Sequence, residues 1–138
     1  MLNQPQISFY LFERSSERQV DSACRLCRKI LAQHAKIWWY CSDTAQQTEL
    51  DERLWSFEAT SFIPHGIGQI DAAVCISEQL PPSSDWIVFN FNNHALEAVH
   101  DFSHIIEIVE NNEAAKQLGR EKFKRYRSLG IEPRTFKL

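Results

Sequence analysis

Five short apolar runs, alternating with polar stretches of helical spacing, constrain the fold of this chain more than any other feature. The runs are ISFYLF (7–12), IWWYC (37–41), AAVCI (72–76), WIVFNF (86–91) and IIEIV (105–109). The helical stretches cover about 16–34, 43–56, 93–102 and 113–129. Short runs rich in β-branched and aromatic residues predict buried strands. Strands that alternate with helices predict an α/β fold with a mainly parallel sheet flanked by helices.

Two of the predicted helices carry terminal signals. Asp43, followed by Gln46 three residues later, is typical of a helix N-terminus, and Gly130 is typical of a residue that ends a helix. The third and fourth runs are separated by only about ten residues, too few for a helical crossover. The strand order at that point therefore stays open.

The length and composition predict one domain covering residues 1–138. A chain of 138 residues with 43% apolar residues can bury a core without disulfide or metal support. No apolar run approaches the roughly 20 residues of a membrane helix. The start MLNQPQ lacks a basic region followed by an apolar one, as a secretion signal would have. We expect a cytoplasmic protein that does not associate with membranes.

The position of the glycines argues against a nucleotide site. A phosphate-binding loop needs glycines after the first strand, so that backbone N–H groups can surround the anion. Here that turn reads ERSSER, and the glycines lie at positions 66, 68, 119 and 130. We therefore expect neither a dinucleotide nor a nucleoside triphosphate to bind there.

Other catalytic patterns are also weak. Cys24 and Cys27 have the C-x-x-C spacing of a redox pair, but they fall in the middle of a predicted helix, on the same stripe as Val20 and Leu31. We favour buried free thiols there, and also at positions 41 and 75. A thiol- or nucleotide-dependent enzyme remains the alternative.

Histidine and serine side chains complete the search for reactive groups. His100 and His104 are four residues apart, a spacing that can hold a metal, but no cysteine pair completes such a site and we favour ordinary surface histidines. Ser83 and Ser84 match no nucleophile motif. We expect a protein that is not an enzyme and that needs no metal or cofactor.

The charge is distributed unevenly. Residues 1–115 hold 7 Lys+Arg against 16 Asp+Glu, a balance of −9, whereas residues 116–138 hold 8 against 2, a balance of +6. At helical spacing, one stripe of the last helix collects basic side chains around an aromatic ring. Its members are Lys116, Arg120, Phe123, Lys124 and Arg127. We expect Phe123 to belong to this basic stripe rather than to the core.

A second stripe of the same helix is its natural core face. It consists of Ala115, Leu118, Tyr126 and Leu129. Lys122 lies on it too, and we expect its ammonium group to reach the solvent along an extended side chain.

The basic stripe has three possible roles. It can be an ordinary solvated helix face, or it can hold single-stranded nucleic acid by phosphate contacts and base stacking. The remaining balance of −9 would repel a polyanion over most of the surface. A compact ligand with several carboxylates and an apolar group fits the stripe better.

Large apolar residues also gather in LWSFEATSFIPHGI, residues 54–67. Trp55 lies about 100° from the core residue Leu54 on the second predicted helix, and Phe62 follows in a loop. Packing of the loop onto the sheet and an exposed protein interface both remain possible.

With these features together, the sequence resembles the chi subunit of bacterial DNA polymerase III. The resemblance rests on FYLF (9–12), LDERLWSFEATSFIPH (50–65) and KQLGREKFKRYRSLG (116–130). It implies a mononucleotide-binding-like (Rossmann-like) α/β domain that binds no nucleotide.

The resemblance also implies a function. Chi subunits link the clamp loader to single-stranded DNA-binding protein by holding that protein's acidic C-terminal tail, which ends in a phenylalanine carboxylate. The matching positions are Lys116, Arg120, Phe123 and Lys124. The clamp-loader subunit psi would dock on an aromatic surface at Trp55 and Phe62, and an accessory helicase is a further candidate partner there. DNA would be contacted only indirectly; direct binding of single strands remains the alternative.

Overall fold

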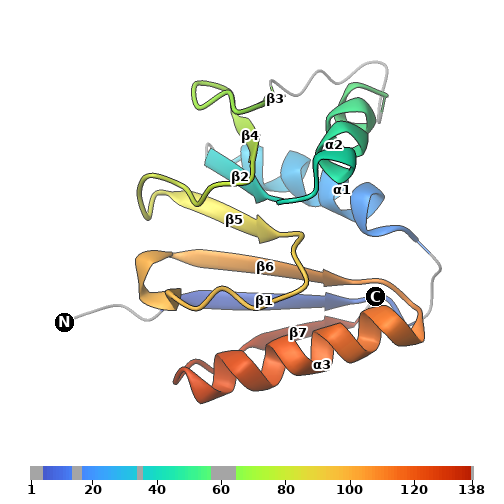
Figure 1. The fold of residues 1–138 in the computed structure, drawn as a ribbon, viewed down its shortest axis with the longest axis vertical. Coiled ribbons are helices and arrows are strands. Elements are labelled where there is room, and N and C mark those ends of the chain that lie inside the picture. Colours follow the sequence, from blue (N-terminus) through green and yellow to red (C-terminus); the bar gives the residue numbers. More distant parts are fainter. Residues whose placement is uncertain (1–4, 14–16, 34–35, 57–64, 138) are drawn as a thin grey trace.

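The computed structural model describes residues 5–13, 17–33, 36–56 and 65–137. These residues form one seven-stranded sheet with helices on both faces (Figure 1). The strands are β1 Gln6–Leu11, β2 Lys36–Tyr40, β3 His65–Ile67, β4 Val74–Ser77, β5 Trp86–Asn90, β6 His104–Val109 and β7 Arg134–Lys137. The helices are α1 Gln19–Leu31, α2 Thr44–Ser56 and α3 Glu113–Ser128, with a 3₁₀ turn, η1, at Val99–Asp101.

All neighbouring strands of this sheet run parallel. Their order is β3-β4-β2-β5-β6-β1-β7, so β3 and β7 lie at opposite edges. The predicted mainly parallel α/β fold is therefore confirmed, and the order of β4 and β5, which the sequence left open, is settled because β2 lies between them.

The two faces of the sheet carry two separate hydrophobic cores. In β6, Ile106 and Ile108 face α1 and α2, whereas Ile105, Glu107 and Val109 face α3. This alternation follows from the two-residue period of a strand. Figure 1 shows α3 alone along the β6, β1 and β7 end, while α1 and α2 lie together over the other part of the sheet. A single helix therefore has to cover the sheet at the β1 end.

The core under α1 contains three of the four cysteines, whereas Cys75 lies in the core under α3. Cys24 and Cys27 are buried free thiols, and the indole Nε1 of Trp39 donates to Cys27 Sγ at 3.1 Å. Burial raises the pKa of Cys24 to about 12 and that of Cys27 well above its usual value. The prediction of buried free thiols is therefore confirmed. A thiol with so high a pKa carries almost no thiolate near neutral pH, and this disfavours a redox role for the pair.

One predicted helix is wrong. Residues 93–102 form an irregular segment with only the short η1 turn, not a helix. Leu96, Val99 and Phe102 are buried in the core under α3, and their spacing of three gave the helical pattern. Spacing of three suits a loop that returns to the sheet at intervals as well as it suits a helix.

Two edge strands escaped prediction, whereas the terminal signals were correct. β3 has only three residues, including Gly66, and all four residues of β7 are exposed. The Asp43 side chain accepts from the backbone N–H of Ala45 at 2.9 Å and caps α2. Gly130 has a φ of +92° and ends α3, a conformation that glycine adopts without strain.

Candidate functional site

The last helix approaches the sheet unusually closely at one point. Asn112 caps α3 by accepting from the backbone N–H of Ala115 at 2.8 Å. Two turns later, a Cβ added at Gly119 would lie 2.9 Å from Val109 Cγ2. A side chain at that position would push α3 away from β6, so glycine here allows the close approach that forms the floor of the site.

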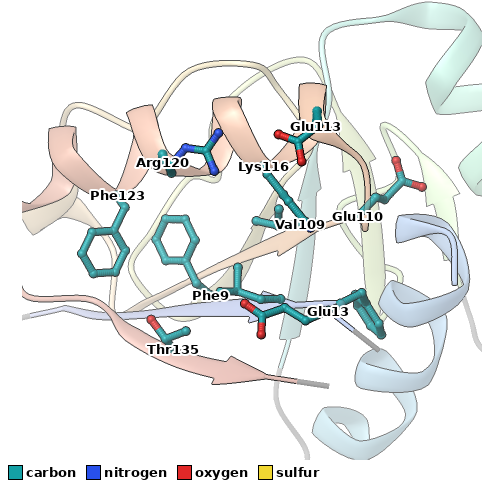
Figure 2. Close-up of a pocket in the computed structure, with 12 residues that line it drawn as sticks. Phe9, Glu13, Val109, Glu110, Glu113, Lys116, Arg120, Phe123 and Thr135 are labelled. Carbon is teal, nitrogen blue, oxygen red and sulfur yellow. The ribbon is translucent and has the colours of Figure 1, made fainter. Parts of the chain in front are cut away.

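A groove of about 480 Å³ runs between α3 and the strands β1 and β6. Phe9 and Phe123 meet at its base, with ring centroids 5.4 Å apart, and Val109 and Thr135 extend the floor. Figure 2 shows Lys116 and Arg120 on the helix above these two rings. The groove thus combines an apolar base with basic side chains along one wall.

The structure brings together three of the four residues that the sequence predicts for tail binding. Lys116, Arg120 and Phe123 line the groove, whereas Lys124 is exposed on α3 and does not line it. Phe123 is half-buried and packs against the core under α3, so the expectation that it stays off the core holds only in part. Its ring contributes to the core and to the groove base at once.

The basic side chains of α3 fall into two groups. Three form ion pairs within the chain: Lys122 with Glu107, Arg125 with Glu97, and Arg127 with Glu132. Among the residues that the structure describes, Lys116, Arg120 and Lys124 form no ion pair; Arg120 donates only to the Gln117 side chain, at 3.0 Å. The cations beside the groove are therefore available to an anionic ligand.

Carboxylates lie at the other end of the groove. Glu13, Glu110 and Glu113 line it where β1 and β6 end and α3 begins. Glu110 accepts from the backbone N–H of Gln19 at 3.0 Å, at the first turn of α1. In nucleotide-binding sheets the phosphate lies at such strand ends, so three carboxylates there disfavour a phosphate.

A buried polar cluster lies directly beneath α3. Lys122 is only 9% exposed, and its Nζ lies 2.8 Å from Oε1 of Glu107, which is 1% exposed. The expectation that Lys122 reaches the solvent is wrong, because a strand carboxylate holds its ammonium group inside. Tyr126 OH donates to Glu107 Oε2 at 2.6 Å, and burial together with this carboxylate raises the tyrosine pKa.

The other predicted surface lies at the opposite edge of the sheet. Trp55, in the last turn of α2, is 59% exposed, and its ring lies 5.0 Å from that of His65 in β3. Ile67 and Ile70, in and after β3, are also exposed. Phe62 belongs to residues 57–64, outside the described part of the chain. Of the predicted pair, only Trp55 can therefore be placed.

The remaining candidates form no reactive site in the described residues. His100 is exposed in η1, and His104 Nε2 lies 3.0 Å from Ser8 Oγ. No three His, Cys, Asp or Glu side chains of the described ranges cluster as metal ligands. No helix within those ranges is long and apolar enough to cross a membrane.

Sequence reasoning missed the floor of the groove and the buried cluster. Phe9, Val109 and Thr135 come from three strands, and nothing local in the sequence indicates that they meet under α3. A signal for Glu107 did exist. It is the one charged residue in IIEIV, and strand alternation puts it on the same face as Ile105 and Val109.

The described residues form a parallel α/β protein with an apolar groove and basic side chains along one wall, and the turn after its first strand contains no glycine. The family model of the DNA polymerase III chi subunit, HolC, matches residues 5–134. The chain belongs to this family, whose members are non-catalytic accessory subunits of the polymerase.

Individual relatives agree with the family match. The DNA polymerase III subunit chi of Pseudomonas aeruginosa is 34% identical over 128 residues, which cover 90% of each chain. The chi subunit of Haemophilus influenzae is 26% identical over 88% of this chain and 90% of the relative. That of Escherichia coli K12 is 24% identical over 93% of this chain and 95% of its own length.

Proposed function

We propose that this chi-family protein holds the acidic C-terminal tail of single-stranded DNA-binding protein in the groove under α3, and so links that protein to the clamp loader. A second partner, psi, docks at the Trp55 surface. The observation that carries the proposal is that Lys116 and Arg120, beside an apolar groove, have no ion-pair partner among the described residues, whereas other cations of α3 are paired.

The groove matches the chemistry of such a tail. Its terminal phenyl ring fits beside Phe9 and Phe123, where aromatic rings pack edge to face or offset. The guanidinium of Arg120 can bond both oxygens of the terminal carboxylate, because its N–H groups form a planar fork. Lys116 adds a second positive charge on the same wall.

The charges also favour one direction for the peptide. Glu13, Glu110 and Glu113 at the strand ends repel the acidic residues that precede the terminal phenylalanine. Lys124 lies further along α3, away from these three carboxylates, and attracts the acidic residues of the tail. The tail therefore runs from Lys124 toward Arg120, with its terminal ring over Phe9.

A tether needs two sites that bind independently. The strands β3 and β1 are five spacings apart in the sheet, or roughly 24 Å at about 4.8 Å per spacing. Sites this far apart with no shared side chains act almost additively. A chain with this role works in the cytoplasm, next to the replicating DNA, without contacting that DNA itself.

A peptide titration tests the tail site. A fluorescent peptide with the last residues of the cell's own single-stranded DNA-binding protein is titrated with wild type and with Arg120→Ala, and binding is followed by anisotropy. We expect Arg120→Ala to lose about 2 kcal/mol or more, roughly 30-fold in affinity. Equal affinities for the two proteins would contradict the proposal.

Three controls make this result specific. Arg127→Ala removes the same charge from the same helix, but Arg127 pairs with Glu132 and does not line the groove, so affinity should change little. A peptide without its terminal phenylalanine should bind weakly to wild type. A bare single-stranded oligonucleotide should not bind even at low salt, and steep salt-dependent binding would instead favour direct nucleic-acid recognition.

A further inference from the structure

We propose that the buried ion pair of Lys122 and Glu107 is a positioning device for the docking groove. In this role it fixes where α3 lies along and across the sheet, and thereby sets Arg120 and Phe123 over Phe9. Its effect on tail affinity rests on the function proposed above, but its effect on the helix can be measured without any ligand.

The pair is buried, and both oxygens of the Glu107 carboxylate are hydrogen bonded. Glu107 uses both carboxylate oxygens: Oε1 accepts from Lys122 Nζ at 2.8 Å, and Oε2 accepts from Tyr126 OH at 2.6 Å and from Asn90 Nδ2 at 2.7 Å. Lys122, Glu107, Tyr126 and Asn90 are all at least nine-tenths buried. One carboxylate therefore connects α3, β5 and β6 inside the core.

The same cluster also holds the irregular segment after β5. Tyr126 OH accepts from the backbone N–H of Leu96 at 3.1 Å, and Asn90 Nδ2 donates to the backbone carbonyl of His94 at 2.9 Å. The segment predicted as a helix is thus fixed to α3 and the sheet by polar contacts instead. The position of α3 is therefore determined both by the sheet, through Glu107, and by the segment after β5, through Leu96.

The position of Glu107 in the sheet explains why the groove depends on it. In the β1–β6 register, Glu107 lies directly beside Phe9, the residue at the base of the groove. Lys122 stands next to Phe123 and two residues after Arg120 on α3. Pairing of Lys122 with Glu107 therefore places those two side chains above the strand that carries Phe9.

An apolar contact alone would define this position less strictly. A shift of α3 by one turn moves each side chain about 5.4 Å along the helix axis. Apolar side chains can repack after such a shift, but Lys122 and Glu107 would both become buried charges without a partner. Buried polar pairs can fix register in this way even where they add little to stability.

The test is a double substitution that removes both charges. Glu107→Leu with Lys122→Met fills the space with apolar atoms but removes the acceptor of the Tyr126 hydroxyl, so we expect its melting temperature to fall by a few degrees, less than that of Glu107→Leu alone. We expect its tail affinity to fall about tenfold, and the amides of α3 to exchange with solvent about tenfold faster in hydrogen exchange. Each single substitution leaves a buried charge unpaired and should lower the melting temperature by several degrees.

The exposed ion pair of the same helix provides the control. Glu97→Leu with Arg125→Met makes the same chemical changes at side chains that are about half exposed, so affinity and exchange should stay at wild-type values. If the buried double substitution also keeps wild-type affinity and exchange, the pair has only a packing role and the proposal is wrong.

Two further outcomes are covered. If the double variant does not fold, Tyr126→Phe replaces it, because this change removes only the hydroxyl that joins Glu107 to Leu96. Tyr126→Phe should weaken tail binding about threefold and speed the hydrogen exchange of α3. Unchanged affinity and exchange would overturn the proposal. If wild type itself does not bind the tail, the proposed function fails, and hydrogen exchange of α3 alone decides whether the pair positions the helix.

Discussion

The two ends of the sheet offer surfaces of opposite kinds. At the β1 end, α3 leaves a groove with an apolar base and cations on one wall. At the β3 end, Trp55 and Ile67 project outward, 59% and 45% exposed. A groove suits a short flexible segment, while a projecting aromatic side chain suits a pocket on a folded partner.

The difference follows from how the sheet is covered. The part under α1 and α2 has two helices and a core in which the thiols and large rings fill the space. Among the described helices, only α3 lies on the face of the sheet that carries Phe9, and the strip that it leaves uncovered beside Phe9 forms the groove. Incomplete cover of one face of a parallel sheet thus creates the groove.

Trp55→Ala should show the largest difference between its effects on the two binding affinities. Loss of a central aromatic anchor commonly costs about 2 kcal/mol or more in binding, so psi affinity should fall while tail affinity stays unchanged. Because Trp55 is mostly exposed, the melting temperature should stay within about a degree or two of wild type. Calorimetric titration with each partner, beside a thermal melt, measures all three quantities.

Leu54→Ala is the matched control for that substitution. Leu54 is adjacent in α2 but 2% exposed, so its truncation should cost about 2–5 kcal/mol of folding free energy and weaken both activities together. If Trp55→Ala behaves like Leu54→Ala, Trp55 has a packing role and the β3 end is not a separate docking surface.

Lys116→Ala should have a smaller effect at the groove. A partly exposed lysine contributes mainly long-range attraction, so we expect a loss of about 1 kcal/mol or less at low salt. The loss should nearly vanish at about 0.5 M salt, where charges are strongly screened. Anisotropy titrations at the two salt concentrations measure this. A loss that does not depend on salt would mean that Lys116 makes a direct, desolvated contact with the tail.

The smallest expected effect concerns His104, the first residue of β6. Burial lowers its pKa below the usual 6.5, so the folded protein takes up this proton less readily than the unfolded chain. Above about pH 7 His104 is neutral in both states and does not change the free energy of unfolding. As the pH falls below 6.5, its protonation favours the unfolded chain and lowers that free energy. Urea unfolding of wild type and His104→Gln between about pH 7.5 and 5.5 should show a weaker pH dependence for the variant. Identical pH dependence would contradict this assignment.

The sequence predicts those parts of the structure that local patterns determine. The five predicted strands have runs rich in β-branched and aromatic residues, and Cys24 and Cys27 lie on an amphipathic helix whose inward face is clear. The stripe containing Lys116 and Arg120 also follows from helical spacing. Each of these features depends on neighbours within a few residues.

Features that depend on distant residues could not be predicted. β7 pairs with β1 through four exposed residues that have no strand pattern. Helical spacing places Lys122 on the core face, but its ammonium group was expected in solvent because its partner, Glu107, lies in a strand distant in sequence. The groove itself forms only when α3 is seated on β6 at Gly119, which local periodicity cannot reveal.

The contact proposed between Arg120 and the terminal carboxylate of the tail can be tested by a double-mutant cycle. Wild type and Arg120→Ala are each titrated with the tail peptide carrying a free C-terminus or a C-terminal amide. We expect amidation to weaken binding to wild type but hardly to affect Arg120→Ala, with a coupling energy of about 1.5–3 kcal/mol. If amidation weakens both proteins equally, so that the coupling is below about 0.5 kcal/mol, Arg120 does not bind the carboxylate.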